Sequence, residues 1–303
     1  MLKINEELKK YNLKPTKYTN YKNVVIVDTD NGSYVFKKNT NSNIFEYLKT
    51  KNFTYFPTIY SDLEDEYLIT KYINSIDITD AQKATDIIDL VSLLHNKTTH
   101  YKNVSIDEYK KIYEDISNNI EYLYNYYNDL MTIIESKVYM SPPEYLLAIN
   151  ISKIYGALNY CKKTLDDWYD KIKDKKNKRL VVIHNNLKLE HFINSNEPYL
   201  ISWDKAKIDM PIFDIYKLFK YNDNFDYSGC LKRYENKYPL KEDERLLLFV
   251  LLALPDEIKF NESNLNMCIK ITEQLNLLDS VSNLVSPYYL KNTEKDKKQE
   301  YKY

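Results

Sequence analysis

Residues 181–204, VVIHNNLKLEHFINSNEPYLISWD, decide the fold class of this chain. The stretch reads as an apolar strand, a polar loop and a second apolar strand, and the loop holds two of the chain's four histidines, His184 and His191. Polar side chains at the ends of buried strands are typical of binding and catalytic sites. We therefore expect a functional site at this loop.

The composition excludes several classes of function. A formal net charge of −1 over 303 residues gives no electrostatic basis for binding nucleic acid or a membrane surface. The 3 cysteines lack CxxC spacing, which argues against disulfides or a thiolate metal site and fits a reducing cytosol. The longest apolar run, 246–254, is too short to span a membrane. The polar start of the chain is unlike a secretory signal, so we expect a cytoplasmic protein.

The first 75 residues are expected to form a small antiparallel sheet with one helix. The apolar segments 23–30 and 33–38 flank Asn31-Gly32, a dipeptide that favours the turn of a β-hairpin. The segment 41–51 has apolar residues at helical spacing. Residues 66–73 return to a strand and run into a polar connection.

Beyond residue 76 the sequence predicts mainly helices. Apolar residues recur at helical spacing, and Ser141-Pro-Pro-Glu144 is a capping-box start. The expected helices cover about 80–97, 105–138, 141–174 and several segments of 212–283. The chain should therefore divide into an N-terminal lobe (1–75), a helical C-terminal lobe (76–290) and a charged, disordered tail (291–303).

The order of motifs resembles that of the aminoglycoside phosphotransferase and choline kinase group, which are small-molecule kinases with a protein-kinase-like fold. The group's pattern is His-x-Asp-x-x-x-x-Asn, then Ile-Asp-Trp or Ile-Asp-Phe, then Pro-x-x-Asp. IHNNLKLEHFI (183–193) and YLISWDKAKIDMPIFDIYKLF (199–219) are similar to this pattern. SYVFKK (33–38) and LVSLLHNKTT (90–99) are similar to other segments of the group.

The phrase WDKAKIDMPIFD (203–214) is similar to the spore-coat branch of this group. The resemblance covers about residues 15–225. It implies an α+β, protein kinase-like two-lobe fold, with a small N-terminal antiparallel sheet plus one helix, and a large helical C-lobe that contains the catalytic and metal loops.

Carried over by position, the resemblance implies nucleotide-binding roles in the N-lobe. Lys37 falls at the lysine that holds the nucleotide phosphates, and Glu46 falls at its ion-pair partner. The segment against which adenine lies would include Lys71, Tyr72 and Ile73. The alternative is that Lys37 is a solvated lysine and Glu46 a surface helical residue. The expected nucleotide loop, 18–23, contains no glycine, although a close backbone cradle for phosphates normally uses it.

The positions that would perform catalysis hold other residue types. His184 falls at the loop histidine, which supports the loop. Asn186 replaces the general-base Asp, and an amide cannot accept a proton near neutral pH. His191 replaces the metal-binding Asn, and Ser202 replaces the metal-binding Asp. Because Mg²⁺ prefers carboxylate oxygens, we expect no Mg²⁺ and weak or no binding of ATP.

Neighbouring residues offer a route by which metal binding could be restored. Asp204 lies two residues beyond Ser202, so on a strand it would face the same side, and Glu190 precedes His191. His191 with Asp204 could hold zinc or manganese. The alternative is that Asp204 is a surface charge. Asp214 falls at the family's helix-start Asp, which braces the catalytic loop, although it also fits a plain helix N-cap.

Three interpretations of function remain. The leading one is a catalytically degenerate kinase-like protein, a pseudokinase, with a binding, scaffolding or spore-coat-associated role toward a protein or small-molecule partner. The second is an active ATP-dependent phosphotransferase for a small hydroxylated substrate that uses Asp204 or Glu190 in altered roles. The third is a helical protein of another family that matches by chance. None of them predicts a nucleic-acid or membrane partner.

Overall fold

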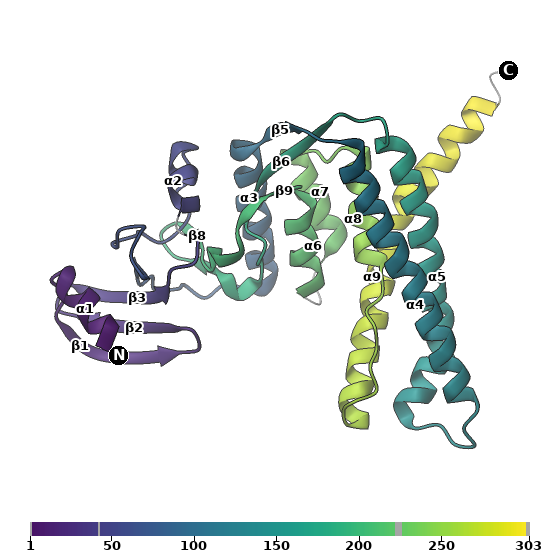
Figure 1. Ribbon diagram of the computed structural model, residues 1–303, viewed down its shortest axis with the longest axis horizontal. Helices are drawn as coiled ribbons and strands as arrows, with labels where there is room; N and C mark the ends of the chain where they lie inside the picture. The colour runs from purple at the N-terminus through teal and green to yellow at the C-terminus, as the bar shows by residue number, and fades with distance from the viewer. Residues whose placement is uncertain (1, 42, 222–225, 301–303) are drawn as a thin grey trace. The chain divides into compact units, whose positions relative to one another are not determined.

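The computed structural model describes residues 2–41, 43–221 and 226–300, with side chains for 4–41, 43–221 and 226–288 (Figure 1). The chain forms two compact units. The first comprises 1–100, 180–222 and 236–238, and the second comprises 101–179, 223–235 and 239–303. This division differs from the predicted boundary at residue 76, because 76–100 and 180–222 group with the N-terminal segment.

An antiparallel sheet of four strands, in the order β1-β2-β3-β4, forms the N-terminal part of the first unit. Its strands are β1 (Pro15–Tyr21), β2 (Val24–Thr29), β3 (Gly32–Lys38) and β4 (Tyr67–Lys71). The predicted β2–β3 hairpin is present, with Thr29 opposite Gly32. Gly32 has a φ of 116°, which a side chain would oppose. This explains why glycine follows Asn31 at the turn.

Two helices accompany this sheet, although the sequence predicts one. The predicted helix is α2 (Asn43–Thr50), and the additional helix is α1 (Leu2–Lys10). Ile4 and Leu8 of α1 lie at i, i+4 spacing and are buried against Val27, Phe36 and Ile69 of the sheet. Burying an aliphatic side chain of this size contributes about 1.5–3 kcal/mol. This explains why a short helix with a largely charged outer face is retained.

The remainder of the first unit consists of helices and short strands that surround the 181–204 stretch. The helices are α3 (Asp80–Thr98) and α6 (Ile212–Tyr221), with the 3₁₀ helices η1 (Leu189–His191) and η2 (Trp203–Lys205). The strands are β6 (Asn177–Ile183, of which the first three residues belong to the second unit), β7 (Phe192–Asn194), β8 (Pro198–Leu200) and β9 (Lys207–Asp209). β7 and β8 form a hairpin, and β6 is the middle strand of a sheet ordered β5-β6-β9, in which β5 is His100–Asn103.

The second unit is mainly helical. Its helices are α4 (Ile106–Glu135), α5 (Pro142–Ile172), α7 (Tyr227–Lys237, of which the last two residues belong to the first unit), α8 (Glu242–Ala253) and α9 (Asn264–Glu300). The predicted capping box is formed at Ser141, whose N–H donates to Glu144 at 2.8 Å. α9 includes residues 291–300, where the sequence analysis expects disorder, because Lys, Glu and Gln favour helix. Residues 301–303 lie outside the described residues.

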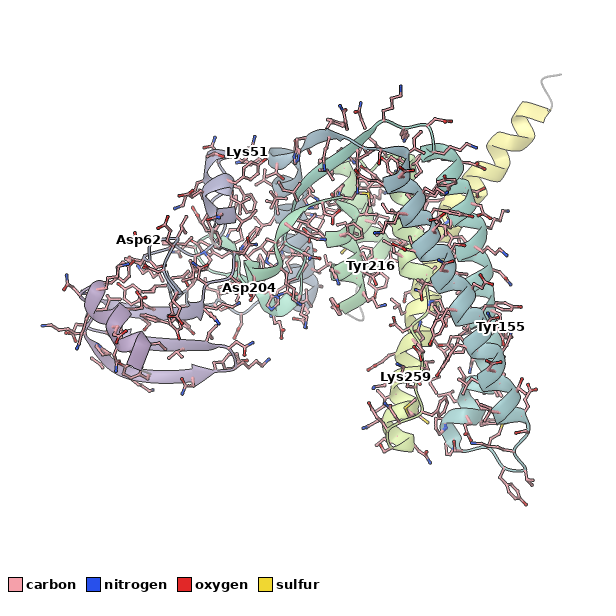
Figure 2. The ribbon with its side chains drawn as sticks, viewed as in Figure 1. Lys51, Asp62, Tyr155, Asp204, Tyr216 and Lys259 are labelled. Carbon is pink, nitrogen blue, oxygen red and sulfur yellow. The ribbon has the colours of Figure 1, made fainter. Side chains whose placement is uncertain are left out.

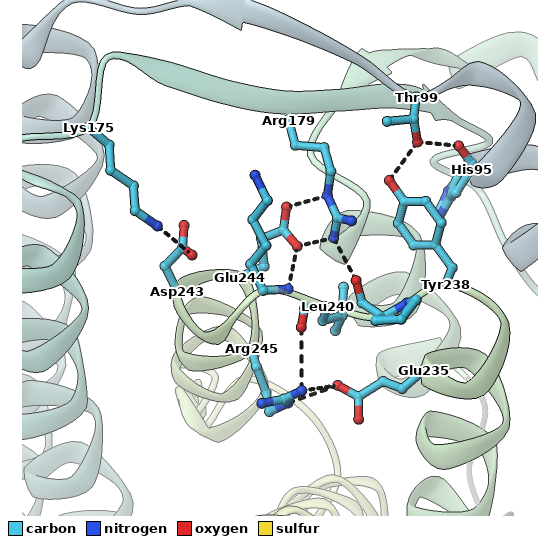
Figure 3. A network of polar contacts seen from close by, with 12 residues as sticks. His95, Thr99, Lys175, Arg179, Glu235, Tyr238, Leu240, Asp243, Glu244 and Arg245 are labelled. Atoms are coloured by element: carbon cyan, nitrogen blue, oxygen red, sulfur yellow. Dashed lines mark hydrogen bonds and ion pairs between the residues drawn. The ribbon is translucent and has the colours of Figure 1, made fainter.

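A buried ion pair joins β6 to α8 in the second unit (Figure 3). Arg179 donates from Nε to Glu244 Oε1 at 2.9 Å and from Nη2 to Glu244 Oε2. The same Nη2 donates to the Pro239 carbonyl at 3.0 Å, and the Lys241 N–H donates to Glu244 Oε2 at 2.9 Å. The two side chains are only 9% and 6% exposed. Glu244 therefore neutralises Arg179 and caps the start of α8 at once.

These elements define an α+β fold with a small antiparallel sheet and a largely helical remainder, as the sequence predicts. In the described part of the chain, no helix combines the length and apolar character needed to cross a membrane.

Candidate functional site

The two faces of the four-stranded sheet have different environments. Cross-strand partners share a face, so Val35 lies beside Ile26 and Thr70, and Lys37 lies beside Val24 and Leu68. All six of these residues line one cavity. The residues that alternate with them pack against α1 on the other face. The period-2 pattern of the strands therefore produces a core on one side and a cavity on the other.

The cavity has a volume of about 410 Å³ and mainly apolar walls, which is the size and character of a small-molecule pocket. Strands β2, β3 and β4 form one wall, and Ile193 and Ile201 contribute to the lining from the 181–204 stretch. The polar residues that reach it include Lys37, Ser202 and Asp204. Its remaining lining residues include Phe45, Pro57 and Trp203.

The sequence-predicted nucleotide positions meet at this cavity, with one exception. Lys37, Lys71, Tyr72 and Ile73 all line it, whereas Glu46 lies exposed on α2. The expected Lys37–Glu46 ion pair is not formed between these two described residues. Lys37 Nζ instead donates to Asp204 Oδ2, in a half-buried pair whose side chains are 25% and 34% exposed. Asp204 is labelled in Figure 2.

Asp204 reaches Lys37 because the strand before it ends early. The sequence analysis places Asp204 on a strand, facing the same side as Ser202. In the structure β8 ends at Leu200, and Ser202 adopts φ 67° and ψ 47°, a left-handed conformation that is uncommon for serine. The chain then enters η2 with Asp204 at its centre. The left-handed residue therefore changes the direction of the chain and aims the next carboxylate at the sheet.

The η2 turn is held by buried contacts on several sides. The Trp203 indole donates to the Leu200 carbonyl at 2.8 Å, and the indole is 4% exposed. The ring packs against Phe45, Phe53, Phe56 and His184. Asn41 donates to the Ala206 carbonyl at 2.7 Å, and Asn185 donates to the Lys205 carbonyl at 3.1 Å. Because backbone groups on both sides of Asp204 are fixed, its carboxylate has a defined position.

The loop after β6 is braced by one buried carboxylate. Asp214 has no exposed surface and accepts hydrogen bonds from the backbone N–H groups of His184 at 2.8 Å and Asn185 at 2.6 Å. Its Oδ2 also lies 3.2 Å from His95 Nε2 of α3. Asn185 has a φ of 57°. Asp214 lies inside the first turn of α6, which begins at Ile212, so it is not the helix N-cap. From there it stabilises a loop turn that needs an unusual backbone conformation.

His184 is a buried, neutral histidine. Its Nε2 lies 2.8 Å from the Ile201 carbonyl, which can only accept, so Nε2 holds the proton. Nδ1 has no hydrogen-bond partner among the described residues. Desolvation lowers the pKa of His184 to about 4, despite the nearby carboxylate of Asp214. His184 thus connects the loop to the end of β8 without being exposed to a ligand.

The pKa of His184 predicts a specific loss of stability in acid. The unfolded chain protonates this ring below about pH 6.5, whereas the folded chain does so only near pH 4. Its contribution is therefore complete above pH 6.5 and falls as the pH decreases to 4. We expect the free energy of unfolding to fall by up to about 3 kcal/mol more in the wild type than in His184→Gln over this range. Urea denaturation at several pH values measures this, and equal losses in both proteins would contradict it.

The predicted base and metal positions do not converge on the cavity as a set. Asn186 and His191 are not among its lining residues, although Ser202 and Asp204 are. His191 Nδ1 donates to the Asn186 carbonyl at 2.6 Å, and burial lowers the pKa of His191. Its Nε2 lies 3.8 Å from Glu190 Oε1.

This donor set does not fit a magnesium ion. A protein site for Mg²⁺ normally supplies one or two carboxylates together with other oxygen ligands, but Asp204 already binds Lys37 and His191 offers one imidazole nitrogen. Across the described residues, no three His, Cys, Asp or Glu side chains lie together in a metal-binding arrangement.

The expected nucleotide loop is a two-residue hairpin turn. Residues 18–21 are the end of β1, and Lys22-Asn23 form the turn to β2, with Tyr21 opposite Val24. Lys22 takes a φ of 51°, and its ammonium lies 5.7 Å from the centre of the Tyr21 ring. Because a lysine occupies the left-handed position, this turn has none of the freedom that a glycine loop has to close over a ligand.

Sequence reasoning missed several residues that build the cavity. The sequence predicts Val24, Ile26 and Val35 only as strand residues. It predicts Ile193 and Ile201 only as apolar residues of the 181–204 stretch. The alternation of the strands contained the signal for the first three. Asn41, which holds the η2 turn, had no sequence signal because its partner is a backbone carbonyl 165 positions away.

The small sheet, the largely helical remainder and the cavity beneath the sheet define a kinase-like two-lobe fold. Sequence comparison finds no matching family model and no matching curated protein. Solved structures share the fold. An aminoglycoside phosphotransferase from Alicyclobacillus acidocaldarius has a TM-score of 0.68 at 10% identity and covers 94% of each chain.

Two further solved structures have the same fold. The spectinomycin phosphotransferase APH(9)-Ia in its AMP-bound complex has a TM-score of 0.59 at 15% identity, over 92% of this chain and 97% of that one. The choline kinase LicA from Streptococcus pneumoniae has a TM-score of 0.51 at 17% identity, over 91% and 98%. The chain therefore shares its fold with these aminoglycoside phosphotransferase and choline kinase structures.

Proposed function

We propose that this protein is a catalytically degenerate kinase-like protein that binds a nucleotide-class ligand weakly and without a divalent metal, in a binding or scaffolding role. The observation that supports it most directly is the pairing of Lys37 with Asp204 inside the cavity. The lysine at the phosphate-binding position is thereby occupied by a carboxylate of the chain itself. Its interaction partner would be a protein or a small molecule.

The apolar cavity supports the ligand-binding half of this proposal. Its two walls, on β2–β3 and at Ile193 and Ile201, suit a flat aromatic base. Ile73 lines the cavity, and among the described residues its backbone N–H and C=O make no hydrogen bond. These groups are therefore available to the edge of a base. A similar fold, that of spectinomycin phosphotransferase, has been solved with AMP bound.

The residue types support the loss of catalysis. Asn186 cannot act as a general base, and loss of such a group typically costs about 10²–10⁴ in rate. The metal positions hold an imidazole and a hydroxyl in place of an amide and a carboxylate. Since the roles act as a unit, these losses are not additive, but no described side chain replaces all three.

Thermal unfolding with ATP, with and without Mg²⁺ or Mn²⁺, tests the proposal. We expect millimolar ATP to raise the midpoint by only about 1–2 °C, equally with and without metal, because a weak ligand stabilises by RT ln(1 + [L]/Kd). A large stabilisation that requires Mg²⁺ would overturn the degenerate assignment. No stabilisation by any nucleotide-class ligand would leave a purely structural role.

Restoring the three family residue types provides a complementary test. The triple variant Asn186→Asp, His191→Asn, Ser202→Asp should gain Mg²⁺-dependent nucleotide stabilisation if the roles are aligned correctly. The matched control is Asn186→Asp alone, which restores the base but not the metal positions. Equal behaviour of the triple and the single variant in Mg²⁺ would contradict the alignment of roles.

An active phosphotransferase is the second candidate, because Asp204 lies in the cavity and is a carboxylate. In that case Asp204 would have to leave Lys37 and take over a role in catalysis. ATP turnover with Mg²⁺ or Mn²⁺ that is abolished by Asp204→Asn would favour this candidate. Absence of turnover in the wild type would favour the degenerate protein.

A further inference from the structure

Three lysines of the sheet line the cavity, and one of them, Lys37, is paired with the carboxylate of Asp204. The other two are Lys38 and Lys71. Their cross-strand partners are Tyr67 and Tyr34, which pack on the α1 side of the sheet. Cross-strand partners share a face, so among the described sheet residues only Lys37 has its ammonium directed into the cavity.

The partner of Lys37 is built into the fold. Asp204 stands between Trp203, which is buried among aromatic rings, and a backbone that Asn41 and Asn185 hold by hydrogen bonds. Releasing Lys37 by moving Asp204 would disturb these contacts. The backbone that carries Asp204 is therefore held in place beside the cavity, and its carboxylate lies within reach of Lys37.

This arrangement selects the charge of the ligand. A polyphosphate that entered the cavity would meet the Asp204 carboxylate and would compete with it for Lys37. Among the described residues, no cluster of three His, Cys, Asp or Glu side chains lies together to hold a cation that would shield this repulsion. A ligand with an aromatic group and no charge would use the apolar walls and the backbone of Ile73 without disturbing the pair.

From this geometry we infer that the cavity binds an uncharged aromatic ligand of the nucleoside class in preference to a nucleoside triphosphate, and that Asp204 is the residue that determines this preference. The inference rests on the proposed function, since it assumes that the cavity is a ligand site. The inference goes beyond the proposed function because it specifies the charge of the ligand and names the residue that excludes phosphates.

Isothermal titration without divalent metal tests the inference. Adenosine, guanosine, cytidine and uridine are each compared with their 5′-triphosphates, on the wild type and on Asp204→Asn. For the best-bound base, we expect the wild type to bind the nucleoside about tenfold or more tighter than the triphosphate. In Asp204→Asn, triphosphate affinity should rise about tenfold or more, while nucleoside affinity changes less than about threefold.

The control variant is Asp209→Asn, which removes a nearby carboxylate that pairs with Lys207 and does not line the cavity. It should reproduce the wild-type preference. The inference would be overturned if the wild type bound the triphosphate tighter than the nucleoside, or if Asp204→Asn left the triphosphate affinity unchanged. In either case, weak binding without metal would still support the proposed function. Absence of binding for all eight ligands would overturn both.

Discussion

Asp214→Asn is expected to lower the free energy of unfolding of the first unit by about 3–5 kcal/mol, the cost of breaking a fully buried charged network. Asp214 accepts from the backbone of His184 and Asn185 and contacts His95. An asparagine side chain has one acceptor oxygen, so its NH₂ group would face one of these donors. One backbone N–H would then remain buried without a partner.

Tryptophan fluorescence can follow this loss in the first unit. The chain has 2 tryptophans, Trp203 in the first unit and Trp168 in the second. In a Trp168→Phe background, urea denaturation followed by Trp203 should report the destabilisation. Asp80→Asn is the matched control, because Asp80 also lies in the first turn of a helix but is 77% exposed. A loss no larger than that of the control would contradict the role of Asp214 in the loop.

Glu244→Gln is expected to lower the free energy of unfolding of the second unit by about 3–5 kcal/mol, because it leaves the Arg179 guanidinium buried without its counter-charge. Arg179 makes a two-point contact with Glu244, and the Lys241 N–H loses its charged acceptor at the start of α8. The loss arises from desolvation of the remaining cation more than from the removed contact.

The same helix provides the control for this prediction. Glu242 is 59% exposed and pairs with Lys171 at 3.1 Å, and an exposed pair of this kind contributes about 0–1 kcal/mol. In a Trp203→Phe background, followed by Trp168 fluorescence, Glu242→Gln should therefore have a small effect and Glu244→Gln a large one. Similar effects of the two variants would show that the buried pair contributes no more to the free energy of unfolding than the exposed pair does.

Much of the local structure could be predicted from the sequence. The hairpin at Asn31-Gly32 and the capping box at Ser141 involve residues only a few positions apart. The physical causes of such elements are backbone conformation and short-range hydrogen bonding, which the residue types themselves determine. The order of the motifs likewise led to the fold class, since it preserves the spacing of a two-lobe kinase-like protein.

The site was only partly predictable. Lys37, Lys71, Tyr72 and Ile73 do share one cavity, as their assigned positions imply. The predicted ion pair of Lys37 with Glu46 was wrong, because Glu46 is exposed on α2 and Lys37 binds Asp204. Spacing along a helix indicates which side chains share a face, but it does not indicate how the helix is rotated relative to a strand.

Local sequence patterns were enough to predict most of the secondary-structure elements, although not α1, and the alternation that gives the sheet two different faces. Which side chains meet depends on the tertiary packing. Lys37 and Asp204 are 167 positions apart, and their contact depends on a left-handed Ser202 and on the buried indole of Trp203. Such a contact is produced by the packing of distant segments, and packing leaves no local pattern in the sequence.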